Sequence, residues 1–229
     1  MESLIVFDMD GVLAEVTESY REAIVRTVQH FTGKQIEREL IQEYKNRGGW
    51  NNDWALSQKI TADLGVSVDY DTVVDRFNVF FLGPEGDGEG LIQRERWFPE
   101  PGFLERLGVR HDFAIFTGRV RYEVVITLRR FGNGVKFDPI LCADEIAAEK
   151  PAPDGLIEIQ RRKPARKMWY VGDTVDDARC ARAAGVPFIG VAARSNSKRE
   201  TLIQLLAQEN AAAVVENVNE IEEVLCRKA

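Results

Sequence analysis

Short, unbroken apolar runs recur along the chain and are separated by longer stretches of mixed polarity. They are LIVF (4–7), FAIF (113–116), MWYVG (168–172), PFIGV (187–191) and AAVV (212–215), with a shorter candidate, PILCA, at 139–143. Unbroken apolar runs of this length are typical of parallel strands that are buried on both faces, whereas a half-exposed strand alternates apolar and polar residues. The pattern therefore predicts a parallel sheet with both faces covered.

Segments with helical spacing lie between these runs. YEVVITLRRFG ends at Gly132, DGLIEIQRR follows Pro153, DDARCARAAG ends at Gly185, and SKRETLIQLLAQEN follows Arg194. Glycine suits the C-terminus of a helix, and strands that alternate with helices favour a parallel arrangement. We expect an α/β fold with a doubly wound parallel sheet and a Rossmann-like core.

The stretch between Leu13 and Phe98 departs from this alternation. It has no strand pattern, but it has amphipathic helical patterns near 17–31, 36–46, 53–64 and 70–82, followed by the glycine-rich acidic stretch GPEGDGEG at 83–90. We therefore predict a small helical domain at 16–95, inserted after the first strand of an α/β core that comprises 1–15 and 96–229.

Composition narrows the classes of partner. The chain has 229 residues, enough for one core plus a small accessory domain, and its 30 basic and 37 acidic residues give a net charge of −7. Nucleic acid and anionic membranes both require a basic surface, so neither is expected as a partner. Three scattered cysteines indicate a reducing compartment, and no apolar run approaches the roughly 20 residues of a membrane span. No targeting segment precedes the first run, and we expect a cytoplasmic protein of unknown oligomeric state.

Candidate site residues follow four of the predicted strands. They are Asp8 and Asp10, then Thr117, Gly118 and Arg119, then Lys150, and finally Asp173 and Asp177. Because ligands of open α/β sheets bind beyond the carboxyl ends of the strands, we expect these side chains to meet at one edge. Carboxylates suit Mg²⁺, and the cation removes the electrostatic penalty of crowding them. A carboxylate held there can also be a nucleophile.

DMDGVL, FTGR, EKPAPDGL and VGDTVDD, in this order, resemble the four motifs of the haloacid dehalogenase superfamily, and the helical insert resembles that superfamily's type-1 cap. The resemblance implies that Asp8 is the nucleophile and Asp10 the general acid and base. It also implies that Thr117 binds phosphate, that Lys150 steadies the nucleophile and phosphate, and that Mg²⁺ is held by Asp8, Asp10 (through its main-chain oxygen), Asp173 and Asp177. The founding dehalogenases lack the second aspartate, so Asp10 points to phosphoryl transfer.

The resemblance implies a Mg²⁺-dependent phosphatase that hydrolyses a small soluble phosphomonoester, of the phosphoglycolate or sugar-phosphate class, through an aspartyl-phosphate intermediate. Two alternatives stay open. One is a phosphomutase with the same aspartyl-phosphate chemistry, and the other is a non-catalytic binding protein on this fold. Capped phosphatases of this group often place an aspartate and then serine or threonine after the first motif, whereas this chain has Ala14-Glu15-Val16.

Substrate-binding residues are expected in two places. Gly118 and Arg119 follow the second motif strand, and Arg47, Trp50 and Asn51 lie in the stretch RGGWNNDW (47–54) between two helices of the insert. The alternative for this stretch is purely structural: Asn52 or Asp53 caps the next helix, and Trp54 packs inside the insert. For Arg119 the alternative is a surface ion pair.

Overall fold

The computed structural model describes residues 3–132, 134–164 and 167–227. The chain divides into two compact units, one formed by Met1–Glu15 with Trp97–Ala229 and the other by Val16–Arg96. No helix in these described ranges is long and apolar enough to cross a membrane.

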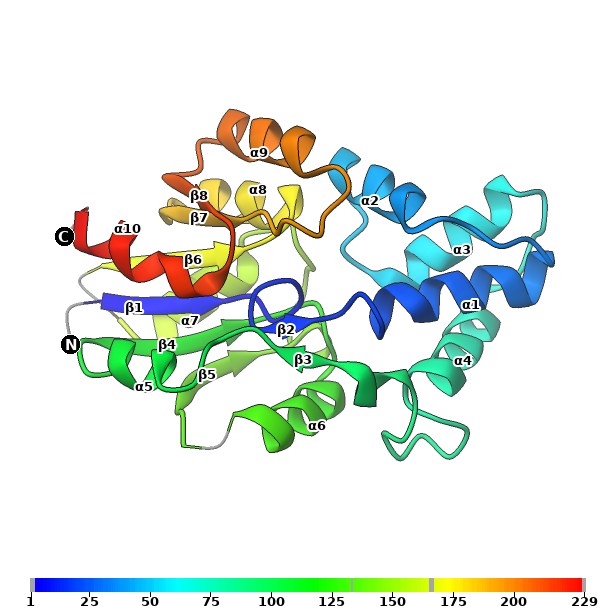
Figure 1. The fold of residues 1–229 in the computed structure, drawn as a ribbon, viewed down its shortest axis with the longest axis horizontal. Helices are drawn as coiled ribbons and strands as arrows, with labels where there is room; N and C mark the ends of the chain where they lie inside the picture. The colour runs from blue at the N-terminus through cyan, green and yellow to red at the C-terminus, as the bar shows by residue number, and fades with distance from the viewer. Residues whose placement is uncertain (1–2, 133, 165–166, 228–229) are drawn as a thin grey trace. The chain divides into compact units, whose positions relative to one another are not determined.

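The first unit is built on a sheet of six parallel strands in the order β5-β4-β1-β6-β7-β8 (Figure 1). The strands are β1 (Ser3–Phe7), β4 (His111–Phe116), β5 (Phe137–Leu141), β6 (Met168–Gly172), β7 (Phe188–Val191) and β8 (Ala213–Val215). Phe7 is in register with Ile115 on one neighbour and with Val171 on the other. The central strands therefore end level with one another, which brings the residues after them to one edge.

Helices cover both faces of this sheet, as Figure 1 shows for α5 and α10 in front of it and α7 behind it. The helices are α5 (Phe103–Leu107), α6 (Arg121–Phe131), α7 (Asp154–Arg162), α8 (Val175–Ala184), α9 (Arg199–Gln208) and α10 (Ile221–Arg227), with 3-10 turns at Ala143–Glu145 and Val218–Glu220. The predicted doubly wound α/β fold is confirmed.

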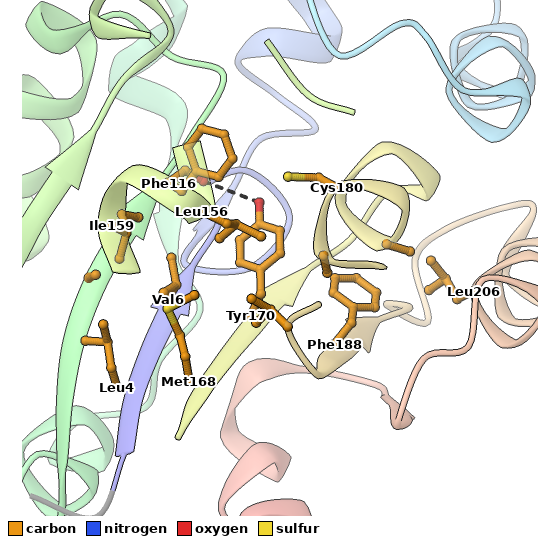
Figure 2. Packing of buried hydrophobic residues seen from close by; sticks show 14 of the residues in the cluster. Leu4, Val6, Phe116, Leu156, Ile159, Met168, Tyr170, Cys180, Phe188 and Leu206 are labelled. Carbon is orange, nitrogen blue, oxygen red and sulfur yellow. Dashed lines mark hydrogen bonds between the residues drawn. The ribbon is translucent and has the colours of Figure 1, made fainter. Parts of the chain in front are cut away.

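Alternation along β1 explains how one strand contributes to both layers. Leu4 and Val6 belong to a buried cluster that includes Leu156 of α7 and Leu206 of α9 (Figure 2). Successive side chains of a strand point to opposite faces, so Phe7 lies on the other side. There its ring packs edge-on against Phe113 of β4, with a centroid separation of 5.5 Å, and against Phe137 of β5, at 6.4 Å.

The second unit is helical. It contains α1 (Tyr20–Thr32), α2 (Arg38–Arg47), α3 (Asp53–Asp63), α4 (Tyr70–Phe81) and a 3-10 turn at Leu91–Arg94. Its interior is aromatic: the rings of Tyr20 and Phe81 lie 4.0 Å apart, and Phe77 packs against both. Aromatic side chains bury large apolar areas and so can stabilise a small core of this kind.

Several short elements differ from the sequence prediction. β2 (Ala14–Glu15) and β3 (Arg96–Trp97) pair as a separate two-stranded sheet, although we expected no strand between Leu13 and Phe98. Two-residue strands are too short to show a period of two. β5 overlaps the PILCA run at 139–143 but is shifted by two residues toward the N-terminus. The short helices α5 and α10 were not predicted.

Candidate active site

The site begins where β1 ends. The Asp8 amide donates to the Val171 carbonyl at 2.8 Å, so the pairing with β6 continues one residue past the strand. The Asp8 side chain is buried, with only 4% of the residue exposed. Gly11 follows with a φ of 71°, a left-handed conformation that suits glycine, and its amide donates to the Ala14 carbonyl at 2.9 Å. The chain therefore turns sharply after presenting Asp8 and Asp10.

Lys150 connects two of the carboxylates. Its ammonium group lies 2.9 Å from Asp8 Oδ1 and 2.8 Å from Asp177 Oδ1, and its side chain is almost completely buried. The rings of Phe116 and Tyr170 flank the same ammonium group at 5.1 and 5.6 Å from their centroids. A cation near aromatic faces is attracted by the ring quadrupoles, so these rings add to the hold on Lys150.

Burial and charge together set the ionisation of this group of residues. Burial raises the pKa of Asp8 well above its ordinary value, and the carboxylates of Asp177, Asp10 and Asp173 raise it further, while Lys150 opposes the rise. Burial by itself lowers the pKa of Lys150, but Asp177 and Asp8 outweigh that effect and leave the pKa raised. Lys150 is therefore a permanent cation beside the predicted nucleophile.

Asp177 is held by several hydrogen-bond donors. Its Oδ1 accepts from Lys150 and, at 2.6 Å, from the Tyr170 hydroxyl. Its Oδ2 accepts from the Thr174 amide at 3.0 Å and the Thr174 hydroxyl at 2.6 Å. Burial raises the pKa of Asp177, but these partners, Lys150 first, outweigh it and leave the pKa below its ordinary value. Figure 2 shows Tyr170 pointing its hydroxyl toward Phe116, whose carbonyl is 3.4 Å away.

Asp173 completes a cluster with metal-ligand spacing. One carboxylate oxygen each from Asp8, Asp173 and Asp177 lie within 4.8 Å of one another. The Asp173 carboxylate packs against the backbone of Gly11, where an added Cβ would lie 1.9 Å from Oδ2. The peptide group that precedes Gly11 carries the main-chain oxygen of Asp10. Asp173 is thus next to the backbone of the first motif, in a space only glycine leaves open.

Arg119 contacts Asp10. Its Nε and Nη2 lie 2.6 and 2.5 Å from Asp10 Oδ1, and its Nη1 donates to the Thr127 hydroxyl of α6 at 2.7 Å. The Arg119 side chain has no exposed surface, so the surface ion pair considered from the sequence is wrong. The Arg119 amide donates to Thr117 Oγ1 at 3.2 Å, which leaves the hydroxyl proton of Thr117 for another acceptor. Gly118, between them, is exposed.

The stretch 47–54 lies in the helical unit. The guanidinium of Arg47 is 5.0 Å from the ring centroid of Tyr44, and the Trp50 ring meets the same ring edge-on at 5.8 Å. Asn52 caps α3 by accepting from the amides of Trp54 and Ala55, as the structural alternative required. Asn51 differs from these residues: its Nδ2 is buried and has no hydrogen-bond partner among the described residues.

Three of the residues that hold the site were not singled out from the sequence. Tyr170 lies inside an apolar strand run, Thr174 looks like an ordinary helix cap, and Thr127 sits in a helix far from any motif. Tyr170 carried one signal, since a hydroxyl inside a buried strand requires a partner. That partner is not predictable without knowing which strand ends lie together.

The family model for haloacid dehalogenase-like hydrolases matches residues 3–185. The chain belongs to this family. All four motifs fall inside the matched residues, and the match extends over the helical insert. The resemblance drawn from the motifs is therefore confirmed for this haloacid dehalogenase-like hydrolase.

Relatives of this hydrolase carry different names. A Phytophthora nicotianae protein named imidazoleglycerol-phosphate dehydratase is 33% identical over 82% of the chain, and the chain spans only 42% of its length. A Pseudomonas fluorescens phosphoglycolate phosphatase is 24% identical, with 94% of this chain and 76% of that protein covered. Among solved structures, phosphatase Tt82 from Thermococcus thioreducens is 27% identical with a TM-score of 0.64, covering 89% of this chain and 99% of that one.

Proposed function

We propose that this chain is a Mg²⁺-dependent phosphatase that hydrolyses a small phosphomonoester through an aspartyl-phosphate on Asp8. The observation that carries the proposal is the contact between Lys150 and Asp8, 2.9 Å apart and buried at the end of the central strands. Family membership and relatives named as phosphatases support it. A buried carboxylate with a permanent cation beside it is suited to attack an electrophilic phosphorus.

The residues present fit a divalent cation. The site holds four carboxylates, those of Asp8, Asp10, Asp173 and Asp177, but only two cations, Lys150 and Arg119. Burial raises the pKa of Asp8, and the neighbouring carboxylates raise it further. Mg²⁺ prefers one or two carboxylates together with water and phosphate oxygens. We assign the carboxylates of Asp8 and Asp173 and the main-chain oxygen of Asp10 as its ligands.

Asp177, which the sequence also suggested as a ligand, has a different part in this proposal. Both of its oxygens already accept two hydrogen bonds each, from Lys150, Tyr170 and Thr174. A ligand role would require some of these bonds to be broken. Asp177 instead fixes the position of Lys150, and through it the orientation of Asp8.

The first chemical step forms a bond between an Asp8 oxygen and phosphorus and breaks the bond to the leaving oxygen, which takes a proton from Asp10. In the second step, water attacks the phosphorus of the aspartyl-phosphate, its proton passes to Asp10, and Asp8 is released. Mg²⁺, when bound by these residues, would supply charge stabilisation to the phosphoryl oxygens. Lys150 and the Thr117 hydroxyl hold those oxygens, because preorganised donors stabilise the charge that develops in the transition state.

The substrate is a small phosphorylated metabolite in this proposal, of the phosphoglycolate or sugar-phosphate class. The selectivity among such esters is assigned to the stretch 47–54, with Asn51 as its first candidate because Nδ2 has no partner among the described residues. Product analysis distinguishes this function from a phosphomutase: a phosphatase releases inorganic phosphate, whereas a mutase returns the phosphoryl group to a sugar hydroxyl.

Hydrolysis of 4-nitrophenyl phosphate tests the proposal. We expect turnover by the wild type with Mg²⁺, none above background with EDTA, and none with Asp8→Asn. Asp75→Asn, an exposed aspartate on α4, is the matched control and should retain wild-type turnover. Equal rates for the wild type with Mg²⁺, the wild type with EDTA and Asp8→Asn would contradict the proposal.

A further inference from the structure

Arg119 is a buried, charged side chain that takes no part in the two proposed chemical steps. None of its side chain is exposed, yet it lies one residue from the exposed Gly118. Taking a guanidinium out of water costs several kcal/mol of desolvation unless its partners are well placed. The partners of this guanidinium must therefore be well placed to offset the cost of its burial.

The partners of the Arg119 guanidinium lie on two different parts of the chain. Nη1 donates to the Thr127 hydroxyl at 2.7 Å, which ties the group to α6. Nε donates to Asp10 Oδ1 at 2.6 Å, and Nη2 lies 2.5 Å from the same oxygen as an ion-pair contact. Arg119 thus joins a rigid helix to the loop that carries Asp10. A direct role in binding the phosphoryl group is disfavoured, because the guanidinium has no exposed surface and lies against these protein groups.

The two contacts with Asp10 converge on a single oxygen. An arginine fork commonly bonds both oxygens of a carboxylate in parallel. Here Nε and Nη2 both contact Oδ1, and Oδ2 forms no hydrogen bond with the described residues. The Asp10 side chain is 30% exposed, in contrast to the buried Asp8. Oδ1 of Asp10 is therefore anchored by Arg119, whereas Oδ2 is not held by that contact.

We propose that Arg119 is a positioning residue for the general acid: by anchoring Oδ1 of Asp10 to α6, it aims Oδ2 at the leaving oxygen of the substrate. This inference rests on the proposed phosphatase function. As Asp8 bonds to phosphorus and the ester bond breaks, the proton on Oδ2 moves to the leaving oxygen. In the second step a proton from the attacking water returns to Oδ2, so Asp10 ends as it began.

Leaving groups of different basicity provide the test. A 4-nitrophenolate departs without protonation, whereas a phenolate is a poorer leaving group and depends on the general acid. kcat/KM for these esters reports only the steps up to transfer of the phosphoryl group to Asp8. The variant Arg119→Lys keeps the positive charge but lacks the fork. We expect kcat/KM to fall about 100-fold with phenyl phosphate, since general acids contribute about 10²–10⁴-fold, and less than about 10-fold with 4-nitrophenyl phosphate.

Two further variants keep the test decisive. Thr127→Val removes the hydroxyl that accepts from Arg119 Nη1. It should change kcat/KM for the two esters in the same direction by a smaller factor, and it carries the test if Arg119→Lys does not fold. In an Asp10→Asn background, Arg119→Lys should add no further discrimination between the esters. Equal losses for both esters would overturn the positioning role alone. A wild type with no Mg²⁺-dependent turnover of either ester would overturn the phosphatase proposal and this inference with it.

Discussion

Lys150 Nζ lies 2.8 Å from Asp177 Oδ1, and water reaches almost none of either side chain. Breaking a buried ion pair by removing one partner leaves an uncompensated charge, which is far more costly than losing a pair at the surface. The pair therefore contributes to folding as well as to the site.

Asp177→Asn should destabilise the fold by about 3 kcal/mol, at the low end of the range for breaking a buried pair, because Asp8 still faces Lys150. The pKa of Asp177 is below its ordinary value in the folded chain, so its contribution is present at neutral pH and is lost as the pH falls through the folded value. Urea denaturation should therefore show a difference between wild type and variant that narrows in acid.

Glu223→Gln is the control for that change. Glu223 pairs with Arg227 on α10, and both side chains are largely exposed. Exposed pairs contribute little, so this variant should change the free energy of unfolding by less than about 0.5 kcal/mol. Equal effects of the two substitutions would contradict the importance of the buried pair.

Tyr170→Phe should destabilise the fold by about 2 kcal/mol, because the lost hydroxyl donates to a charged acceptor, Asp177, at 2.6 Å. The ring and its packing are kept, so the loss measures the hydrogen bond. Tyr70→Phe is the matched control: its hydroxyl accepts from Asn52 at 3.2 Å at an exposed position, and urea denaturation should detect little change. If Tyr170→Phe has the same free energy of unfolding as the wild type, this hydroxyl has no structural role.

Gly11→Ala should weaken Mg²⁺ binding. Its Cβ would lie 1.9 Å from Asp173 Oδ2, so the carboxylate must move away. Displacing groups that orient ligands costs about 10–100-fold in metal affinity, and the Mg²⁺ concentration for half-maximal activity should rise by a factor in that range. Gly185→Ala controls for backbone strain, since Gly185 has a φ of 68° and nothing within 4 Å of an added Cβ. An unchanged Mg²⁺ requirement in Gly11→Ala would count against Asp173 as a ligand.

Mg²⁺ should stabilise the folded chain in the absence of substrate. A ligand that binds only the native state at 100 times its Kd adds about 2.7 kcal/mol, and here it also relieves the repulsion among Asp8, Asp10 and Asp173. The measurement is thermal unfolding with MgCl₂ against KCl at equal ionic strength. Asp173→Asn should lose most of the Mg²⁺-dependent shift, and a shift that persists there would place the cation elsewhere.

Asn51→Ala should alter the KM values for a panel of metabolite phosphates while leaving the free energy of unfolding within about 0.5 kcal/mol of wild type, because Nδ2 has no partner to lose among the described residues. Trp50→Ala is the contrasting variant: it removes packing against Tyr44, and it should cost about 2 kcal/mol of stability. Unchanged substrate preference in Asn51→Ala would exclude it as a specificity residue.

Local pattern was sufficient for most of the core elements. β6 has the boundaries expected from MWYVG, and β1 and β4 contain the predicted runs, because a strand buried on both faces must be apolar throughout. Short elements such as β2, β3 and α5 escaped prediction, since two to five residues do not show a period. The order of strands in the sheet was equally out of reach, because pairing depends on partners distant in the sequence.

The sequence by itself determined which residues follow the strands, and hence that Asp8, Thr117, Lys150 and Asp173 converge at one edge. Only the tertiary structure decided how they are held. Arg119 contacts Asp10 across 109 positions, and Lys150 reaches Asp177 across 27. Such contacts depend on the register of parallel strands, which sets which side chains meet. They also depend on burial, which excludes water and so strengthens the attraction between charged partners. Neither the register nor the burial can be predicted from a local stretch of the chain.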